Sequence, residues 1–373
     1  SWSINKSIAI CEASKSITFF LFFILLQSLL TKYRKLFIEL LLKNVLIIVF
    51  LSLFYFISQF NYISSLKRFD LYSVSGSSGH KNLYSSFIYL SLVLSIFGSV
   101  FLKNKWKAIA LTLIIIQFLL IIILQTRAVW LGIIVFVMLV LLLSLTSKKY
   151  EEISPSKITR IVLTNLVMMN IIFLLVLPKL INTYNDNKPL TYNQENISDL
   201  STFSERTQVW QKTYDIINDN ILFGVGANNW RINVPNYSLP SLYRVTDLNT
   251  TFKRPHNDFL WVLAEYGLIG FNLFFILFIY IVVLLLIKKS NNNKLHNIIL
   301  CSGIIGFLII SFLSFPSERV EHNILLTILL AISTYNIKKS NPNQLPIKTL
   351  TIPRFFLLII LPILIFISYT NLV

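Results

Sequence analysis

The sequence has few of the charged groups that cover a soluble protein. Only 13% of its 373 residues are charged, 55% are hydrophobic, and the mean hydropathy is +0.70. Soluble globular domains carry about 25% charged residues, so this composition excludes a soluble domain. Apolar runs long enough to cross about 30 Å of hydrocarbon recur along the chain. Because these runs are continuous, they predict helices rather than the strands of a barrel. We therefore expect an all-α polytopic membrane protein.

Cysteine is almost absent. Cys11 and Cys301 are isolated and form no C-x-x-C pair, which excludes a disulfide framework or a dithiol redox site. We interpret both as apolar packing. The chain opens on Ser1 and Trp2, without an initiator methionine or a signal peptide. We therefore expect an N-terminal truncation that removes one or more helices.

Motifs for cofactors and metals are also missing. The G-x-G of "FGVGANNW" lacks the third glycine and the preceding strand of a dinucleotide site. The histidines show no ligand spacing such as H-x-x-x-H, although a metal site from His80, His256 and His322 with Asp258 or Glu318 is conceivable. The outer loops contain no D-x-D pair. We expect neither a metal nor a cofactor.

About ten segments are long and apolar enough to be membrane-spanning helices. They lie near residues 17–31, 44–60, 83–102, 108–125, 129–146, 161–178, 266–287, 297–315, 321–336 and 355–370. They predict an N-terminal transmembrane bundle over residues 1–178, an extracytoplasmic loop over residues 179–258, and C-terminal transmembrane helices over residues 259–373.

The formal charge of +17 is explained by topology and does not indicate nucleic acid. Basic residues gather in alternate connections, which the positive-inside rule assigns to the cytoplasm. These are Lys32, Arg34 and Lys35; Lys103, Lys105 and Lys107; Lys148, Lys149, Lys157 and Arg160; Lys288, Lys289 and Lys294; and Lys338, Lys339, Lys348 and Arg354. The other connections, among them the long and nearly neutral loop 179–258, are then expected outside.

The long loop is expected to carry its own structure. Its stretch "STFSERTQVWQKTYDIIND" has Val209, Trp210, Thr213, Ile216 and Ile217 at helical spacing. This pattern predicts an amphipathic helix that packs on the bundle. Ser204 is its expected N-cap.

The polar residues that could carry chemistry lie at the expected outer ends of helices. His256 is flanked by Arg254 and Asp258 just before an apolar run, where water access and a nearby low dielectric suit a general base. The alternative is a polar cap on a membrane helix. Glu265, inside that helix, is expected to pair within the bundle rather than to react.

Several arginines are candidates for binding an anion. Arg127 interrupts the apolar stretch 111–143, and an arginine so close to hydrocarbon is a functional candidate unless it snorkels to the headgroups. Arg206 falls in the expected first turn of the loop helix, where the helix dipole and a bidentate guanidinium both favour phosphate. The alternative for Arg206 is an ordinary surface charge. Arg231, Arg244 and Arg319 are weaker examples of the same pattern.

Several arginines, one well-placed histidine and a membrane bundle suit a lipid-linked pyrophosphate. The lipid tail would lie in the bilayer while its head group meets the arginines. Cationic side chains can stabilise a departing pyrophosphate without a divalent ion.

The same stretches resemble a known family. "HNDFLWVLAEYGLIG" is similar to the H-[N/S/Q]-x9-G-x-x-G signature of the O-antigen ligase and polymerase superfamily. Three further stretches resemble other segments of that family: "GSSGHKN", which ends on Asn82; "TRAVWLG", which contains Arg127; and "SERTQVW", which contains Arg206 and is followed by "FGVGANNW". The likeness spans roughly residues 76 to 335.

The resemblance implies a membrane-embedded glycosyltransferase of the C type in the bacterial inner membrane, with its active site on the periplasmic side. Its donor would be an undecaprenyl-pyrophosphate-linked glycan, and the lipid pyrophosphate would leave with inversion and without a metal. His256 would be the base or would orient the acceptor. The residues that would bind pyrophosphate or glycan are Arg127, Arg206, Arg254, Asn257, Arg319 and Asn82.

Three functions stay open. We favour a ligase that joins finished O-antigen to the lipid A core. A polymerase that extends the glycan, or a relative that transfers it to protein Ser or Thr, has the same chemistry with another acceptor. A flippase or exporter of the lipid-linked glycan is the non-enzymatic alternative, for which polar or broken helices near the midplane are expected.

Overall fold

The computed structural model describes residue 3 and residues 5–64, 75–146, 200–237, 252–287 and 294–340, and all regular structure in these residues is helical. The helices are α1 (Lys6–Ser64), α2 (Lys81–Phe101), α3 (Asn104–Leu124), α4 (Arg127–Thr146), α7 (Leu200–Asp219), α8 (Trp230–Asn233), α10 (Asp258–Ile287), α11 (Lys294–Leu313) and α12 (Val320–Ser340), with short 3-10 helices η2 (Gly76–Ser78), η4 (Val234–Tyr237) and η6 (Pro316–Glu318).

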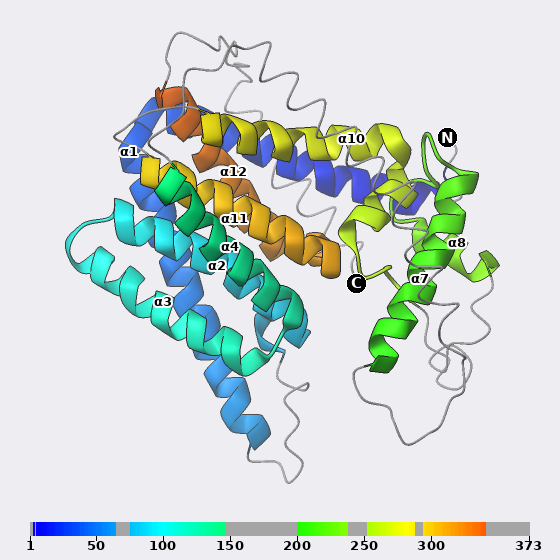
Figure 1. Ribbon diagram of the computed structural model, residues 1–373, viewed down its shortest axis with the longest axis horizontal. Coiled ribbons are helices and arrows are strands. Elements are labelled where there is room, and N and C mark those ends of the chain that lie inside the picture. The colour runs from blue at the N-terminus through cyan, green and yellow to red at the C-terminus, as the bar shows by residue number, and fades with distance from the viewer. Residues whose placement is uncertain are drawn as a thin grey trace.

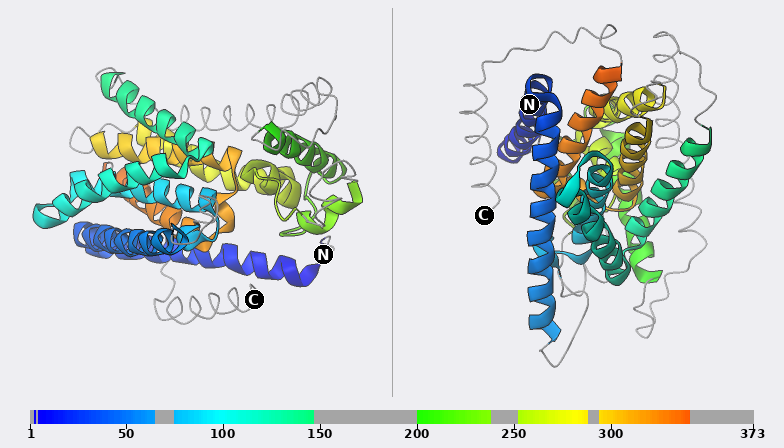
Figure 2. Two further views of the ribbon diagram at one scale, coloured as in Figure 1. Left: turned by 90° about the horizontal axis from the view of Figure 1, so that it is seen from below. Right: turned by 90° about the vertical axis from the view of Figure 1, so that its left-hand side faces the viewer.

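Seven of the described helices, namely α1 to α4 and α10 to α12, are long and apolar enough to cross a membrane. They contain every predicted segment that falls on described residues. Helix α1 contains two of these segments, because the chain turns back at Arg34 (φ 48, ψ −123) and the two halves run in different directions (Figures 1 and 2). The predicted segments 161–178 and 355–370 lie outside the described residues. An all-helical membrane protein is therefore confirmed, while the count of ten and the domain boundaries stay predictions.

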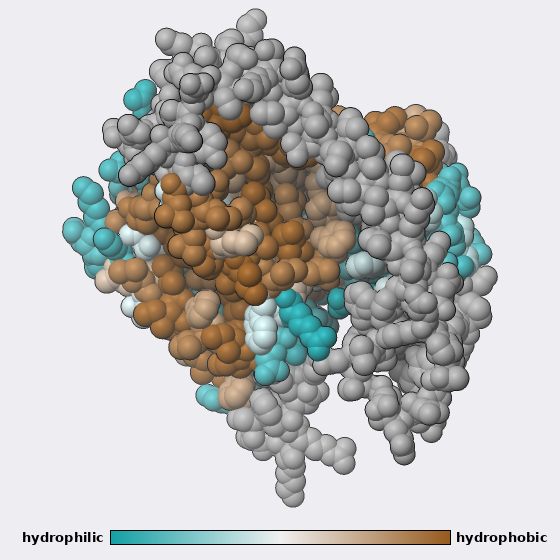
Figure 3. Space-filling model, in the orientation of Figure 1, coloured by the Kyte–Doolittle hydropathy of each residue, from teal (hydrophilic) through white to brown (hydrophobic). Residues whose placement is uncertain are grey.

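Helix α2 lies inside the bundle, and α3 and α4 lie outside it. Helix α2 packs against α1, α3, α11 and α12, whereas α4 packs mainly against α11. Much of the outer surface of α3 and α4 is apolar and exposed, as at Ile115, Ile134 and Leu141. Figure 3 shows a broad apolar face bordered by hydrophilic groups. Such a face suits hydrocarbon rather than water.

Where the lysine-rich connections or the helix ends next to them are described, they share one end of the bundle. Lys35 Nζ lies 5.9 Å from the centre of the Phe101 ring, and that ring lies 5.9 Å from the ring of His296. Arg34 acts electrostatically on Tyr335 near the end of α12. The start of α2, the α3–α4 turn, the start of α10 and the α11–α12 turn must then lie at the opposite end, because each helix other than α1 crosses the bundle once (Figure 1).

The predicted loop helix is α7. Its expected apolar face is confirmed, since Val209, Trp210, Thr213, Ile216 and Ile217 are at most 5% exposed, and the helix packs against α10.

Two details of the prediction for α7 are wrong, because the helix begins at Leu200. Ser204 lies inside the helix and is not its N-cap. Arg206 lies in the second turn, so the unpaired N–H groups of the first turn do not favour an anion there. The cap pattern failed because serine also occurs inside helices.

Helix α10 is broken at Gly267 (φ 64, ψ −171). Residues 221–226 lie against the break and hydrogen-bond with its backbone. Leu268 N donates to Ile221 O at 2.9 Å, and Gly226 N donates to Glu265 O at 2.9 Å. Two further bonds join Ile269 N to Leu222 O at 3.3 Å and Val225 N to Ala264 O at 2.9 Å. Backbone groups that a helix break would leave unpaired are thus satisfied by the loop.

Glycine is needed at both sides of this contact. A Cβ built on Gly267 would lie 2.2 Å from Leu222 O, and one on Gly224 would lie 2.4 Å from the carbonyl carbon of Glu265. Both residues also have positive φ, which other residues adopt only with strain.

We therefore expect Gly267→Ala to lower the free energy of unfolding by about 1–3 kcal/mol, from strained backbone and a forced separation of the two segments. Thermal unfolding of purified protein in detergent measures the change. Gly98→Ala is the matched control, because a Cβ there meets Leu102 Cδ1 at an ordinary 3.6 Å. Equal melting temperatures for the two variants would contradict the close approach.

Candidate active site

Residues 313–319, which connect α11 to α12, form the centre of the site and are called the 313–319 turn. Arg206 Nη1 on α7 donates to Leu313 O at 3.2 Å. The ring of His256 packs edge-on against Phe315 with 4.6 Å between ring centres. Arg319 ends the turn. Arg206, His256 and Arg319 thus come from separate parts of the chain and meet at one short segment.

The backbone on both sides of His256 is held in place. Pro255 O accepts a hydrogen bond from Trp210 Nε1 at 2.7 Å, which ties the segment to α7. Asn257 Oδ1 accepts from two backbone N–H groups in the first turn of α10 at 2.9 and 3.1 Å and so caps the helix. His256 itself has φ 57, in the left-handed region. The imidazole is therefore presented from a fixed and unusual backbone conformation.

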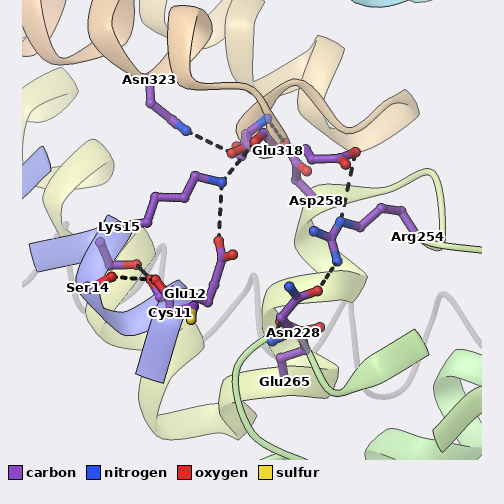
Figure 4. Close-up of polar contacts among 12 residues, drawn as sticks. Cys11, Glu12, Ser14, Lys15, Asn228, Arg254, Asp258, Glu265, Glu318 and Asn323 are labelled. Atoms are coloured by element: carbon purple, nitrogen blue, oxygen red, sulfur yellow. Dashed lines mark hydrogen bonds and ion pairs between the residues drawn. The ribbon is translucent and has the colours of Figure 1, made fainter. Parts of the chain in front are cut away.

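Arg254 is held by its protein neighbours. It is 7% exposed, its Nη1 donates to Asn228 Oδ1 at 2.7 Å, and its guanidinium lies 4.4 Å from the centre of the Trp261 ring. Its Nε lies 3.9 Å from Glu318 Oε2. Figure 4 shows Arg254 between the 313–319 turn and the loop that carries Asn228. Arg254 and Asn257 both hold other parts of the protein in place. If they also contact substrate, they do so in addition to these protein contacts.

The start of α2 completes this end of the bundle. His80 caps α2, with its Nδ1 accepting from Asn82 N at 3.1 Å. Asn82 Oδ1 accepts from Thr126 Oγ1 at 3.3 Å, and Thr126 directly precedes Arg127. Arg127, the first residue of α4, is exposed. Asn82 and Arg127 are thus brought to the same corner.

His80 connects this corner to the turn. A Cβ built on the neighbouring Gly79 would lie 3.9 Å from Arg319 Nη2. Partial burial lowers the pKa of His80 below its ordinary value, and the charges of Arg319, Lys81 and Arg206 lower it further. The imidazole is therefore neutral at pH 7, and because Nδ1 accepts a hydrogen bond, its proton is on Nε2.

Sequence reasoning missed the part played by His80 and Lys81. His80 was considered only as a metal ligand, although it stands two residues before Asn82 in the "GSSGHKN" stretch.

In the described part of the chain, no three His, Cys, Asp or Glu side chains lie close enough to hold a metal ion. His322 is fully buried, and its Nε2 lies 2.9 Å from Leu83 O and 3.2 Å from Ser86 Oγ.

The structure thus defines a polytopic helical membrane protein with a cationic polar site at one end of its bundle. Residues 111–275 match the family described as O-antigen ligase. The match confirms the resemblance to the O-antigen ligase and polymerase superfamily over these residues. No curated protein matches the sequence.

The matched range contains Arg127, Arg206 and His256, and it includes α7 and the break in α10. Members of this family are glycosyltransferase-like ligases and polymerases, so the match supports an enzyme of that general type in a membrane, acting on lipid-linked glycan.

The electrostatic contact between Arg319 and His80 can be measured. Arg319→Gln should raise the pKa of His80 towards its ordinary value, because the charge that lowers it most after burial is removed. NMR titration of histidine-labelled protein in micelles measures this pKa, with His80→Gln to assign the signal. Lys105→Gln, at the far end of the bundle, is the control. An unchanged pKa in the arginine variant would show that the two side chains are not neighbours.

Proposed function

We propose that the protein is an O-antigen ligase, which transfers a glycan from undecaprenyl pyrophosphate to the lipid A–core oligosaccharide at the periplasmic face of the bacterial inner membrane. The observation that carries the proposal is the meeting of Arg206, Arg319 and His256 at the 313–319 turn. This turn lies opposite the described ends of the lysine-rich connections, which the positive-inside rule predicts to be cytoplasmic.

His256 acts as the general base in this reaction. It takes the proton from the acceptor hydroxyl as the hydroxyl oxygen attacks the anomeric carbon of the donor. A new glycosidic bond forms, the bond from that carbon to the pyrophosphate oxygen breaks, and undecaprenyl pyrophosphate leaves. Attack opposite the leaving group inverts the configuration of the anomeric carbon. A base placed in this way contributes about 10²–10⁴-fold to the rate.

Arg127, Arg206 and Arg319 bind the pyrophosphate. Guanidinium groups form bidentate hydrogen bonds with phosphate oxygens, and they stabilise the negative charge that develops on the leaving group. His80 supplies a neutral N–H donor beside them. In this proposal Asn82, Asn257 and Arg254 complete the wall of the site, and no metal takes part. The lipid tail lies along the apolar outer surface of the bundle.

Other acceptors suit the same site. A polymerase, or an enzyme that transfers the glycan to protein Ser or Thr, would use the same donor and base. A flippase or exporter is less well supported. The break in α10 could be a transporter feature, but residues 221–226 fill it and use its backbone groups. The polar residues instead gather at the bundle end.

His256→Ala should reduce glycan transfer by about 10²–10⁴-fold, because the general base is lost. The assay contains purified protein, a defined lipid-linked donor and alternative acceptors, and it measures product and remaining donor. Donor should accumulate with each acceptor, while a chelator should leave wild-type turnover unchanged. Undiminished movement of lipid-linked glycan across vesicles by His256→Ala, with no transfer by wild type, would instead indicate a transporter.

Arg206→Ala should raise the KM for donor about tenfold or more, as expected for the loss of a charged hydrogen bond to phosphate. Arg206→Lys should recover only part of the loss, because lysine cannot form the bidentate contact. Lys212→Ala is the control on the same helix, where Lys212 pairs with Asp215 at 3.3 Å. A KM for donor equal to that of wild type would remove Arg206 from the binding site.

A further inference from the structure

The buried carboxylate of Glu265 holds a loop segment against the break in α10. Glu265 is fully buried. Its Oε2 accepts from Asn228 N at 2.6 Å, and its Oε1 accepts from Trp230 N at 3.2 Å. Together with the four backbone hydrogen bonds between residues 221–226 and 264–269, these contacts form what we call the latch. Both carboxylate oxygens of Glu265 accept hydrogen bonds from backbone N–H groups of the loop.

Arg254 joins the latch to the 313–319 turn. Its Nη1 donates to Asn228 Oδ1, and its Nε faces Glu318 at 3.9 Å. Its guanidinium also packs on Trp261, one turn before Glu265 on the same helix. Figure 4 shows Glu265 and Asn228 on one side of Arg254 and Glu318 on the other. The loop, α10 and the turn are therefore connected through one buried cation.

The latch also fixes α7. The helix ends at Asp219 and the chain enters the latch at Ile221. Toward the N-terminus of α7, Trp210 Nε1 donates to Pro255 O beside His256, and Arg206 donates to Leu313 O. The helix is thus held at three places. The latch is the one at its C-terminal end.

We propose that Glu265 is a positioning residue, which places Arg206 relative to His256 by latching the 221–230 segment onto α10. The inference rests on the proposed function, in which Arg206 binds the donor and His256 activates the acceptor. Glu265 does not touch the substrate. It acts on the reaction because a displacement of about 1 Å between donor and base can cost about 100-fold in rate.

The first test is Glu265→Gln, in which the amide NH₂ cannot accept a hydrogen bond. One of the two loop N–H groups then loses its acceptor. We expect kcat to fall about 10- to 100-fold, while the KM for donor changes less than about threefold, because misalignment affects the reacting geometry more than binding. Glu39→Gln is the control, since Glu39 lies at the other end of the bundle and makes a one-third-exposed 3.9 Å contact with Lys43.

A second variant tests the same connection without removing the buried carboxylate. Asn228→Gly removes the oxygen that binds Arg254, but it keeps the backbone N–H that Glu265 accepts. Asn228 has φ 55, a conformation that glycine adopts without strain, so the variant should fold. Its kcat should fall in the same direction as that of Glu265→Gln, by a smaller factor.

A distance measurement separates this inference from the proposed function. Spin labels at Lys212→Cys on α7 and Val320→Cys on α12, with Cys11→Ser and Cys301→Ala, report the placement of α7 by electron paramagnetic resonance. The distribution should be narrow in the parent and broader in Glu265→Gln, but unchanged in Glu39→Gln.

The outcomes are distinct. A broadened distribution in protein whose wild type transfers no glycan would overturn the proposed function and leave the latch standing. Wild-type kcat in Glu265→Gln, or a lowered kcat with an unaltered distance distribution, would overturn the latch.

Discussion

The backbone pairing at the break in α10 is the constraint on which the site depends. A buried helix break cannot leave N–H and C=O groups unpaired, because each would cost several kcal/mol. Residues 221–226 supply the missing partners, so the loop cannot leave α10 without exposing those groups. A surface loop therefore becomes part of the membrane bundle. The same pairing brings α7, and Arg206 with it, next to the segment that carries His256.

A second constraint comes from the 313–319 turn. Asp258 N donates to Ser314 O at 3.2 Å, and Ser317 N donates to Asp258 Oδ2 at 3.1 Å, so the start of α10 is fixed to the turn directly. Lys15 Nζ of α1 donates to Glu318 O at 2.8 Å on the opposite side (Figure 4). The turn is thus held by α1, α7 and α10 together. A short segment with these connections presents Phe315 and Arg319 with little freedom, which is what catalytic positioning requires.

Hydropathy and helical periodicity predicted the membrane helices and the buried face of α7, because burial against lipid or core repeats along each helix. Hydropathy and periodicity did not predict where α7 starts or that α10 is broken. Ser204 resembles a cap, but the preference for serine there is worth only about 1 kcal/mol. The break at Gly267 depends on partners about forty residues earlier in the chain, which no local pattern contains. His256, Arg206 and Arg127 were identified as active-site candidates. His80 was named only as a conceivable metal ligand, because its neighbours Arg206 and Arg319 are distant in sequence.

The charge around His80 supports the proposed diphosphate donor over a neutral sugar alone. The charged groups that lower the pKa of His80 are all cations, from α2, α7 and the 313–319 turn. Bringing three cations together beside hydrocarbon is unfavourable, and an anion lowers that energy. The amide and carboxylate groups around Glu265 and Arg254 contact one another, and Arg127 at the neighbouring corner is exposed. In the proposed function, one part of this end maintains geometry, and the neighbouring part binds a negatively charged head group.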